Sequence, residues 1–234
     1  MINVGFLRRI VMKKKIVVVG LCLCLLATVA MGDITNSSHN FETVAGGAFN
    51  LFGGEICKAC HTPHNAFNPN IYAPFWDRTD SVVDPYTLYS STTTEPNLPT
   101  TVTLTGVTKL CMSCHDSSVN IDAIGGAGGS VAFGNTDEGH ITVDSTTDDL
   151  SAMHPVGFTY NTGLTSTDGE LHDPATVNTA GLLESYTSPT ALQGSGENLV
   201  TCISCHDVHD SADQADMLRM DNTGSALCLT CHNK

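Results

Sequence analysis

The sequence predicts a loop-rich protein with short helices and little β-structure, organised by something other than a large hydrophobic core. Two observations come from the composition: aromatic residues make up only 6% of the 234 residues, and 21 residues are glycine. The third is the presence of ten cysteines, a heavy supply of thiols beside few large apolar side chains.

Residues 1–32 have the layout of a secretory signal peptide. Half of the ten cations precede the first acidic residue, Asp33, and an uncharged apolar run over 16–31 follows them. Basic, apolar and small-residue regions in this order are typical of an export signal. The alternative is an N-terminal membrane anchor, but a span needs about 20 apolar residues. Met12, which three lysines follow, is a better start than Met1.

Removal of residues 1–32 leaves a single expected domain, 33–234, with 5 cations and 24 anions and hence a charge of -19. Such a chain repels the phosphates of nucleic acids, so we expect no nucleic-acid partner. The two cysteines removed, Cys22 and Cys24, each follow a leucine rather than a small residue, which disfavours a lipoprotein. The eight cysteines that remain all belong to pairs.

Each pair has the form CxxCH, and the four copies are Cys57-Lys-Ala-Cys60-His61, Cys111-Met-Ser-Cys114-His115, Cys202-Ile-Ser-Cys205-His206 and Cys228-Leu-Thr-Cys231-His232. This is the attachment motif for c-type haem. Residues three apart project from the same side of a helical turn, so both thiols reach the two vinyl groups of one porphyrin. The adjoining histidine can then bind the iron as proximal ligand. The pattern predicts four covalent haem c groups.

Two other interpretations of CxxC pairs were considered. Disulfides would suit a secreted chain, and the interval from Cys205 to Cys228 fits a zinc ribbon. Neither needs a histidine after the second cysteine of all four pairs. Haem also compensates for the thin core, because each macrocycle is a large apolar plate fixed to the chain.

The four motifs provide proximal ligands, and six further histidines are candidates for the opposite axial position: His39, His64, His140, His154, His172 and His209. Six candidates are enough to give each of the four irons a second axial ligand. A catalytic metal keeps an open position, so this surplus favours electron transfer over enzymatic catalysis.

The six candidates are not equivalent. His64 and His209 each lie three residues after a motif histidine, too close to reach the far face of the same porphyrin, so we expect each to bind the iron of a different haem. His154 precedes a proline that stiffens the backbone. His39 lies near the expected mature N-terminus, from which it could reach its own haem or another molecule's. His140 and His172 lie in polar segments and are interpreted as solvated loop residues.

The first cysteines of successive motifs are 54, 91 and 26 residues apart, which excludes a solenoid of fixed repeats. Turn-forming residues fill the intervals, so we expect loops over Ser90–Thr94, Gly125–Ser130, Thr162–Gly169 and Thr187–Gly196. Regular structure is expected as a strand over Thr101–Val107, a helix over Ala212–Met220 and a short helix at each CxxCH.

Several blocks of the sequence resemble the secreted tetrahaem cytochromes of metal-reducing bacteria, in particular the OmcE type, which polymerises outside the cell. The blocks are 38–41, 57–66, 110–116, 154–158, 202–209 and 227–233. The resemblance implies a loop-rich multihaem cytochrome c with four bis-histidine haems, in filaments where one haem can take an axial histidine from the adjacent subunit. It assigns distal roles to His64, His154 and His209, and makes His39 the inter-subunit candidate.

We therefore expect an electron-transfer protein, not an enzyme, that is secreted to the cell exterior or surface. Its expected partners are copies of itself in a head-to-tail polymer, redox partner cytochromes and extracellular acceptors such as a metal oxide. A heterologous head-to-tail contact can propagate into an open filament. The alternatives are a soluble periplasmic shuttle and, from another class, a multihaem oxidoreductase with one open haem iron.

Overall fold

A computed structural model describes residues 34–42, 53–67, 73, 75–90, 98–132, 141–142, 148–185, 198–210 and 214–234. All of them belong to one compact unit, Asp33–Lys234. The expected signal segment, His140 and the loop expected over Thr187–Gly196 lie outside the described residues. No helix in the described ranges is long and apolar enough to cross a membrane.

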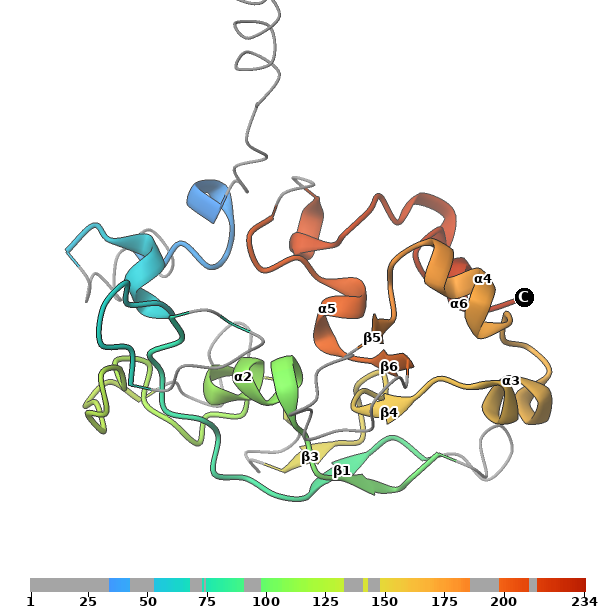
Figure 1. Cartoon of the computed structure of the whole chain (residues 1–234), viewed down its shortest axis with the longest axis horizontal. Helices are drawn as coiled ribbons and strands as arrows, with labels where there is room; N and C mark the ends of the chain where they lie inside the picture. The colour runs from blue at the N-terminus through green and yellow to red at the C-terminus, as the bar shows by residue number, and fades with distance from the viewer. Residues whose placement is uncertain are drawn as a thin grey trace, which may run out of the picture. The chain divides into compact units, whose positions relative to one another are not determined.

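Short helices and very short strands alternate along the described chain (Figure 1). The α-helices are α2 (Gly106–His115), α3 (Thr162–Asp168), α4 (Pro174–Thr179), α5 (Cys202–Cys205) and α6 (Cys228–Cys231). The 3-10 helices are η1 (Ile34–Asn36), η3 (Ile56–Ala59), η4 (Ala215–Met217) and η5 (Thr223–Ser225). The strands are β1 (Tyr86–Leu88), β2 (Thr101–Val102), β3 (Asp149–Leu150), β4 (Phe158–Thr159), β5 (Glu184–Ser185) and β6 (Asn198–Val200).

The first small sheet has the strand order β2-β1-β3. β1 pairs antiparallel with β2 and parallel with β3, which lies some sixty residues further along the chain. Alternate residues of β1 point inward, and Tyr86 and Leu88 pack with Leu104, Met112 and Leu150 in a core cluster. This cluster holds α2, and with it the second CxxCH motif, against the sheet.

The second sheet has the order β4-β6-β5, with both pairings antiparallel. Its core cluster is formed by Tyr160, Leu164, Val177, Leu182, Leu183, Val200 and Leu227. β6 runs directly through Thr201 into α5, so the sheet fixes the point at which the third motif begins. Leu227, the residue just before the fourth motif, packs in the same cluster.

Because Gly157 has no side chain, its backbone can lie close to residues at both small sheets. It has φ +78°, and a Cβ built there would lie 2.5 Å from a Leu104 methyl carbon. Its amide donates to the carbonyl of Val200 at 2.7 Å. A side chain at this position would therefore displace Leu104 and strain the backbone. The glycine thus fixes the path from His154 into β4.

Three local predictions require correction. The strand expected over Thr101–Val107 is only β2, because α2 already begins at Gly106. The loop expected over Thr162–Gly169 is helix α3, which Asn161 caps at its start and Gly169 ends in a left-handed conformation. The helix expected over Ala212–Met220 is, in its described part, only η4, since Leu218 is extended and bridges to His206.

We expect Leu88→Ala to lower the free energy of unfolding by about 2–5 kcal/mol, because it leaves a cavity in a core with few other large side chains. Leu88 is 2% exposed. Val82→Ala is the matched control: Val82 is 77% exposed, and its truncation should change stability by less than about 0.5 kcal/mol. Denaturant unfolding of the purified protein measures both, and equal effects would contradict the assignment of this core.

Candidate functional site

The four CxxCH motifs lie on four short helical turns, as predicted. The turns are η3, the end of α2, α5 and α6. In three of them the carbonyl of the first cysteine accepts a hydrogen bond from the amide of the motif histidine, at 2.8 Å in the first, 3.0 Å in the third and 2.9 Å in the fourth. This bond closes one turn and brings both thiols and the imidazole to one side of it.

The eight described cysteines form no disulfides. Burial raises the pKa of the Cys60 thiol to about 12, with a smaller contribution from Cys114. Interaction with Cys202 raises the pKa of Cys111 and lowers that of Cys202, and burial followed by Cys228 raises that of Cys205. Thiols of the first and second, second and third, and third and fourth motifs are therefore neighbours. The motifs succeed one another in space in the order of the sequence.

Helices α2 and α5 bring the second and third motifs together. They lie side by side at the centre of the described chain, with α2 in green and α5 in orange (Figure 1). The two helices begin from different sheets, α2 after β2 and α5 after β6. Each small sheet therefore positions one motif, and the helix contact joins the two pairs of motifs.

Three of the four motif histidines face a second histidine ring. The ring centroids are 6.1 Å apart for His39 and His115, 6.5 Å for His61 and His209, and 6.2 Å for His154 and His232. A bond between a first-row metal and imidazole is about 2 Å long, which places two imidazoles on opposite sides of one metal with centroids about 6.3 Å apart. Each pair therefore has the separation that one haem iron requires.

Backbone carbonyls orient several of these rings. The Nδ1 atom lies 3.4 Å from the Val208 carbonyl in His39, 2.9 Å from the Pro155 carbonyl in His154 and 2.9 Å from the Asp216 carbonyl in His206. A metal-binding imidazole generally donates its other N–H to such a group. In these three histidines Nδ1 is thus occupied and Nε2 is left for a metal.

Burial keeps His39 and His232 in the form that binds metals. The pKa of His39 is lowered to about 4, chiefly by burial and next by His115. The pKa of His232 is lowered by burial and then by His154. Because neutral imidazole is the ligating form, both pairs are suited to hold iron between them.

The three histidine pairs can be compared one by one with the distal ligands expected from the sequence. His209 lies beside the histidine of the first motif, not beside that of the third motif just before it, as the spacing argument required. His154 lies beside His232. His39 lies beside His115 of its own chain, and the inter-subunit role that the resemblance suggested for it stays a prediction.

The remaining candidates are not brought to a partner in the described part of the chain. His64 is exposed, and no described histidine ring faces it. His172 is tied by its backbone to the fourth motif, because its amide donates to the Cys231 carbonyl at 2.8 Å and its carbonyl accepts from the Tyr160 hydroxyl at 2.7 Å. His206, the third motif histidine, likewise faces no other described histidine ring. His140 lies outside the described residues.

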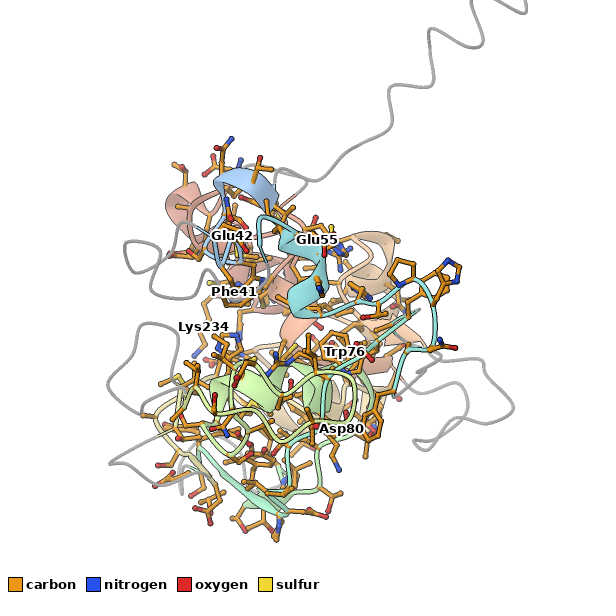
Figure 2. All side chains as sticks on the ribbon, turned by 90° about the vertical axis from the view of Figure 1, so that its left-hand side faces the viewer. Phe41, Glu42, Glu55, Trp76, Asp80 and Lys234 are labelled. Atoms are coloured by element: carbon orange, nitrogen blue, oxygen red, sulfur yellow. The ribbon has the colours of Figure 1, made fainter. Side chains whose placement is uncertain are left out.

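Sequence reasoning missed the segment that supports the first motif, Trp76-Asp77-Arg78. Trp76 packs edge-on against His61, with centroids 5.8 Å apart at 83°; Figure 2 labels this side chain. Its buried Nε1 atom has no hydrogen-bond partner in the described structure and is available to a group bound beside His61. The signal was present, since this is the single tryptophan of a chain poor in aromatic residues.

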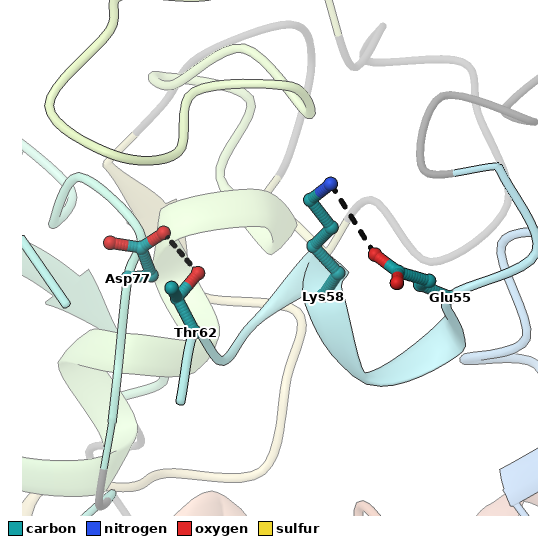
Figure 3. Close-up of polar contacts among 4 residues, drawn as sticks. All are labelled: Glu55, Lys58, Thr62 and Asp77. Atoms are coloured by element: carbon teal, nitrogen blue, oxygen red, sulfur yellow. Dashed lines mark hydrogen bonds and ion pairs between the residues drawn. The ribbon is translucent and has the colours of Figure 1, made fainter. Parts of the chain in front are cut away.

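Asp77 holds the loop that leaves the first motif. Its carboxylate accepts from the Thr62 hydroxyl at 2.5 Å (Figure 3). The carboxylate also accepts from the Phe67 amide at 2.7 Å, and the Asp77 amide donates to the Cys60 carbonyl at 2.9 Å. The Lys58–Glu55 pair, at 3.4 Å, adds an exposed contact across the same turn (Figure 3). An exposed pair of this kind contributes little, so the buried carboxylate is the main restraint.

These features test whether haem fits the residues present. Eight unpaired thiols, three histidine pairs at the separation of axial ligands and a buried unpartnered Trp76 donor all suit it. Within the described ranges, no group of three or more His, Cys, Asp or Glu side chains is placed to hold a metal ion. A haem iron, in contrast, needs only two protein ligands because the porphyrin supplies the others.

A comparison with protein families supports this interpretation. Residues 195–234, which contain the third and fourth motifs, match the family model described as the doubled CXXCH motif. No curated protein matches the chain significantly. The paired CXXCH motif indicates covalently bound haem c and a multihaem c-type cytochrome with a role in electron transfer. The short helices and minor β-structure observed agree with such a protein.

We expect Ser204→Ala to destabilise the turn of the third motif. The Ser204 hydroxyl accepts a hydrogen bond from the Thr201 amide at 2.9 Å in a buried position at the start of α5. Loss of a bond of this kind at a helix start costs about 1 kcal/mol. Thermal unfolding of the purified protein should show a lower midpoint for Ser204→Ala. The exposed Ser38→Ala is the control and should leave the midpoint unchanged. An unchanged midpoint in Ser204→Ala would contradict a stabilising role of the hydrogen bond between Thr201 and Ser204.

Proposed function

We propose that this chain is a secreted tetrahaem c-type cytochrome that conducts electrons outside the cell, as the subunit of a filament directed toward an acceptor such as a metal oxide. The observation that carries the proposal is the set of three histidine pairs, each joining one CxxCH histidine to a histidine from elsewhere in the chain. Such pairs close the irons to substrates. The proposal therefore assigns conduction and not catalysis.

The haem groups supply reversible one-electron chemistry at iron. The chain supplies their spacing and surroundings. Neighbouring thiols in successive motifs keep the four attachment points adjacent. The helix pair α2 and α5 continues this adjacency between the two small sheets. A continuous succession of attachment points is what an electron path through one molecule requires.

The distal ligands follow from the pairs. We propose His209 for the haem of the first motif, His39 for the second and His154 for the fourth. These ligands tie segments that are distant in the sequence, because His209 follows the third motif and His39 precedes the first. Four haems held in this way would stabilise a chain whose own core is small.

For the third motif, we propose that His206 receives its distal ligand from His64 of a neighbouring subunit. His64 is exposed on the loop that Asp77 restrains, and His206 is also exposed. This assignment transfers the inter-subunit role from His39 to His64. It leaves His140 and His172 as the competing ligands within the chain.

A second function is favoured by one observation. His206 faces no other described histidine ring, so an iron there with an open sixth position would allow a multihaem oxidoreductase. A soluble periplasmic shuttle remains the alternative of the same class. High-spin ferric signals in the native protein would support the enzyme, and a strictly monomeric secreted protein would support the shuttle.

We expect the mature protein to carry four haems, all low-spin. Intact mass under denaturing conditions should exceed the polypeptide mass by four haem groups, because thioether bonds survive denaturation. Magnetic resonance of the oxidised native protein should show low-spin ferric iron alone. A mass increase of fewer than four haems would contradict the attachment at all four motifs.

We expect His64→Ala to abolish filament assembly while all four haems remain attached. His172→Ala is the matched control, because that histidine is also outside the three pairs. His39→Ala should instead leave assembly largely intact and make one haem high-spin, since its ring faces His115 in the same chain. Electron microscopy and particle sizing measure assembly, and filaments formed normally by His64→Ala would refute its inter-subunit role.

A further inference from the structure

Arg78 is the largest fully buried side chain of the described structure and lies between the first two motifs. Only 1% of it is exposed. Its Nη1 donates to the carbonyl of Ala59 at 3.2 Å, inside the first CxxCH turn, and its Nε donates to the Ser113 hydroxyl at 3.3 Å, inside the second. One guanidinium therefore bonds to both haem-attachment turns.

The other bonds of Arg78 are also to uncharged acceptors. Nη1 donates to the Ile121 carbonyl at 2.6 Å, and Nη2 donates to the Asn120 carbonyl at 3.1 Å. The described residues place no carboxylate within ion-pair distance of it. Arginine stays protonated in proteins, so a full positive charge lies in the interior, where its partners among the described residues are three backbone carbonyls and one hydroxyl.

Such an arrangement is unusual on energetic grounds. A buried charge is costly unless it is paired, and this chain has 24 acidic residues from which a partner could come. An arginine used only to join the two turns could be paired with a carboxylate without loss of its hydrogen bonds. The retention of an uncompensated charge points to a role for the charge itself.

We propose that Arg78 is a positioning residue that fixes the first and second motifs relative to each other, and that its buried charge raises the reduction potentials of the two haems attached there. The inference rests on the proposed attachment of haem at both motifs. A positive charge in a low-dielectric interior stabilises the reduced iron, which carries one positive charge fewer, over the oxidised iron. Burial also protects this effect from screening by salt.

Outside the cysteines, Arg78 is the charged group with the largest effect on the pKa values of the Cys60 and Cys114 thiols. At Cys60 it is the one charge outside the cysteines that perturbs the thiol, and it lowers the pKa there. At Cys114 its lowering effect on the pKa exceeds the opposing effect of Asp116. Asp77 is also buried near the first turn, where Thr62 and Phe67 solvate its carboxylate. Arg78 thus acts on the thiols of both turns.

Arg219 offers a comparison within the same molecule. It also donates to a carbonyl inside a motif, that of Ile203 in the third CxxCH, at 3.0 Å. Its side chain is exposed. Water and salt screen an exposed charge. Removal of the Arg219 charge should therefore shift the potential much less than removal of the Arg78 charge.

The test is a spectroelectrochemical titration of the haem-loaded protein in the wild type, Arg78→Gln and Arg219→Gln. We expect Arg78→Gln to lower the potentials of two of the four haems, each by about a tenfold change in the ferric-to-ferrous equilibrium, which is about 59 mV for one electron. Replacement of the distal His209 or His39 by methionine identifies those two haems, because methionine ligation raises the potential of the haem it binds. Arg219→Gln should shift the potentials by much less.

If Arg78→Gln does not bind four haems, a second variant, Arg78→Lys, tests the same proposal. Arg78→Lys retains the charge at neutral pH, but a buried lysine titrates well below its usual pKa. Its two haems should keep potentials near the wild type at low pH and fall below it as the pH rises. The other charged groups on or beside the two turns, Glu55, Lys58, Asp77, Lys109 and Asp116, are common to both proteins and cancel in the comparison.

The outcomes separate the two proposals. A protein without covalent haem would refute the proposed function, whatever the role of Arg78. Four haems with unchanged potentials in Arg78→Gln, or equal shifts in Arg78→Gln and Arg219→Gln, would refute the tuning role. A pH dependence in Arg78→Lys identical to that of the wild type would also refute it.

Discussion

The structure depends on one hydrogen-bonded turn, in which the carbonyl of the first cysteine of a motif accepts the amide of the motif histidine. This turn sets two thiols and an imidazole on one side of the backbone, the arrangement that covalent haem attachment needs. The rest of the described chain holds three such turns and the end of helix α2, which carries the second motif, next to one another. Two small sheets, two core clusters and the contact of α2 with α5 perform this task.

Histidines outside the motifs lie beside motif histidines that are far from them in the sequence. His39 of the N-terminal arm lies beside His115, and His209, which follows the third motif, lies beside His61. A chain with few large apolar side chains can be ordered in this way. Under the proposed function, haem would take the structural role that a hydrophobic core has in other proteins, and bis-histidine ligation would favour conduction.

Electrostatics are organised more locally than the composition implies. The chain is acidic as a whole, yet the described residues place no carboxylate within ion-pair distance of the buried Arg78, which lies between the first two motifs. The buried carboxylate of Asp116 is bonded to the hydroxyls of Ser81 and Tyr86. Surface charge and the field at the redox groups can therefore differ in sign. Under the proposal for Arg78, a single buried charge would act on the haem potentials more strongly than the total charge of the chain.

The sequence by itself determined the attachment chemistry, because CxxCH is a local pattern and a single turn creates its geometry; it also required that His209 serve a motif other than its nearest one. It misjudged Thr162–Gly169 and Thr101–Val107, where asparagine capping and the early start of α2 outweighed composition and alternation. Only the tertiary structure decided which histidines meet, that His39 lies beside His115, and that Arg78 bonds to the turns of two motifs. These are contacts between segments far apart in the chain, and a one-dimensional pattern carries no information on which of several equivalent side chains will be brought together.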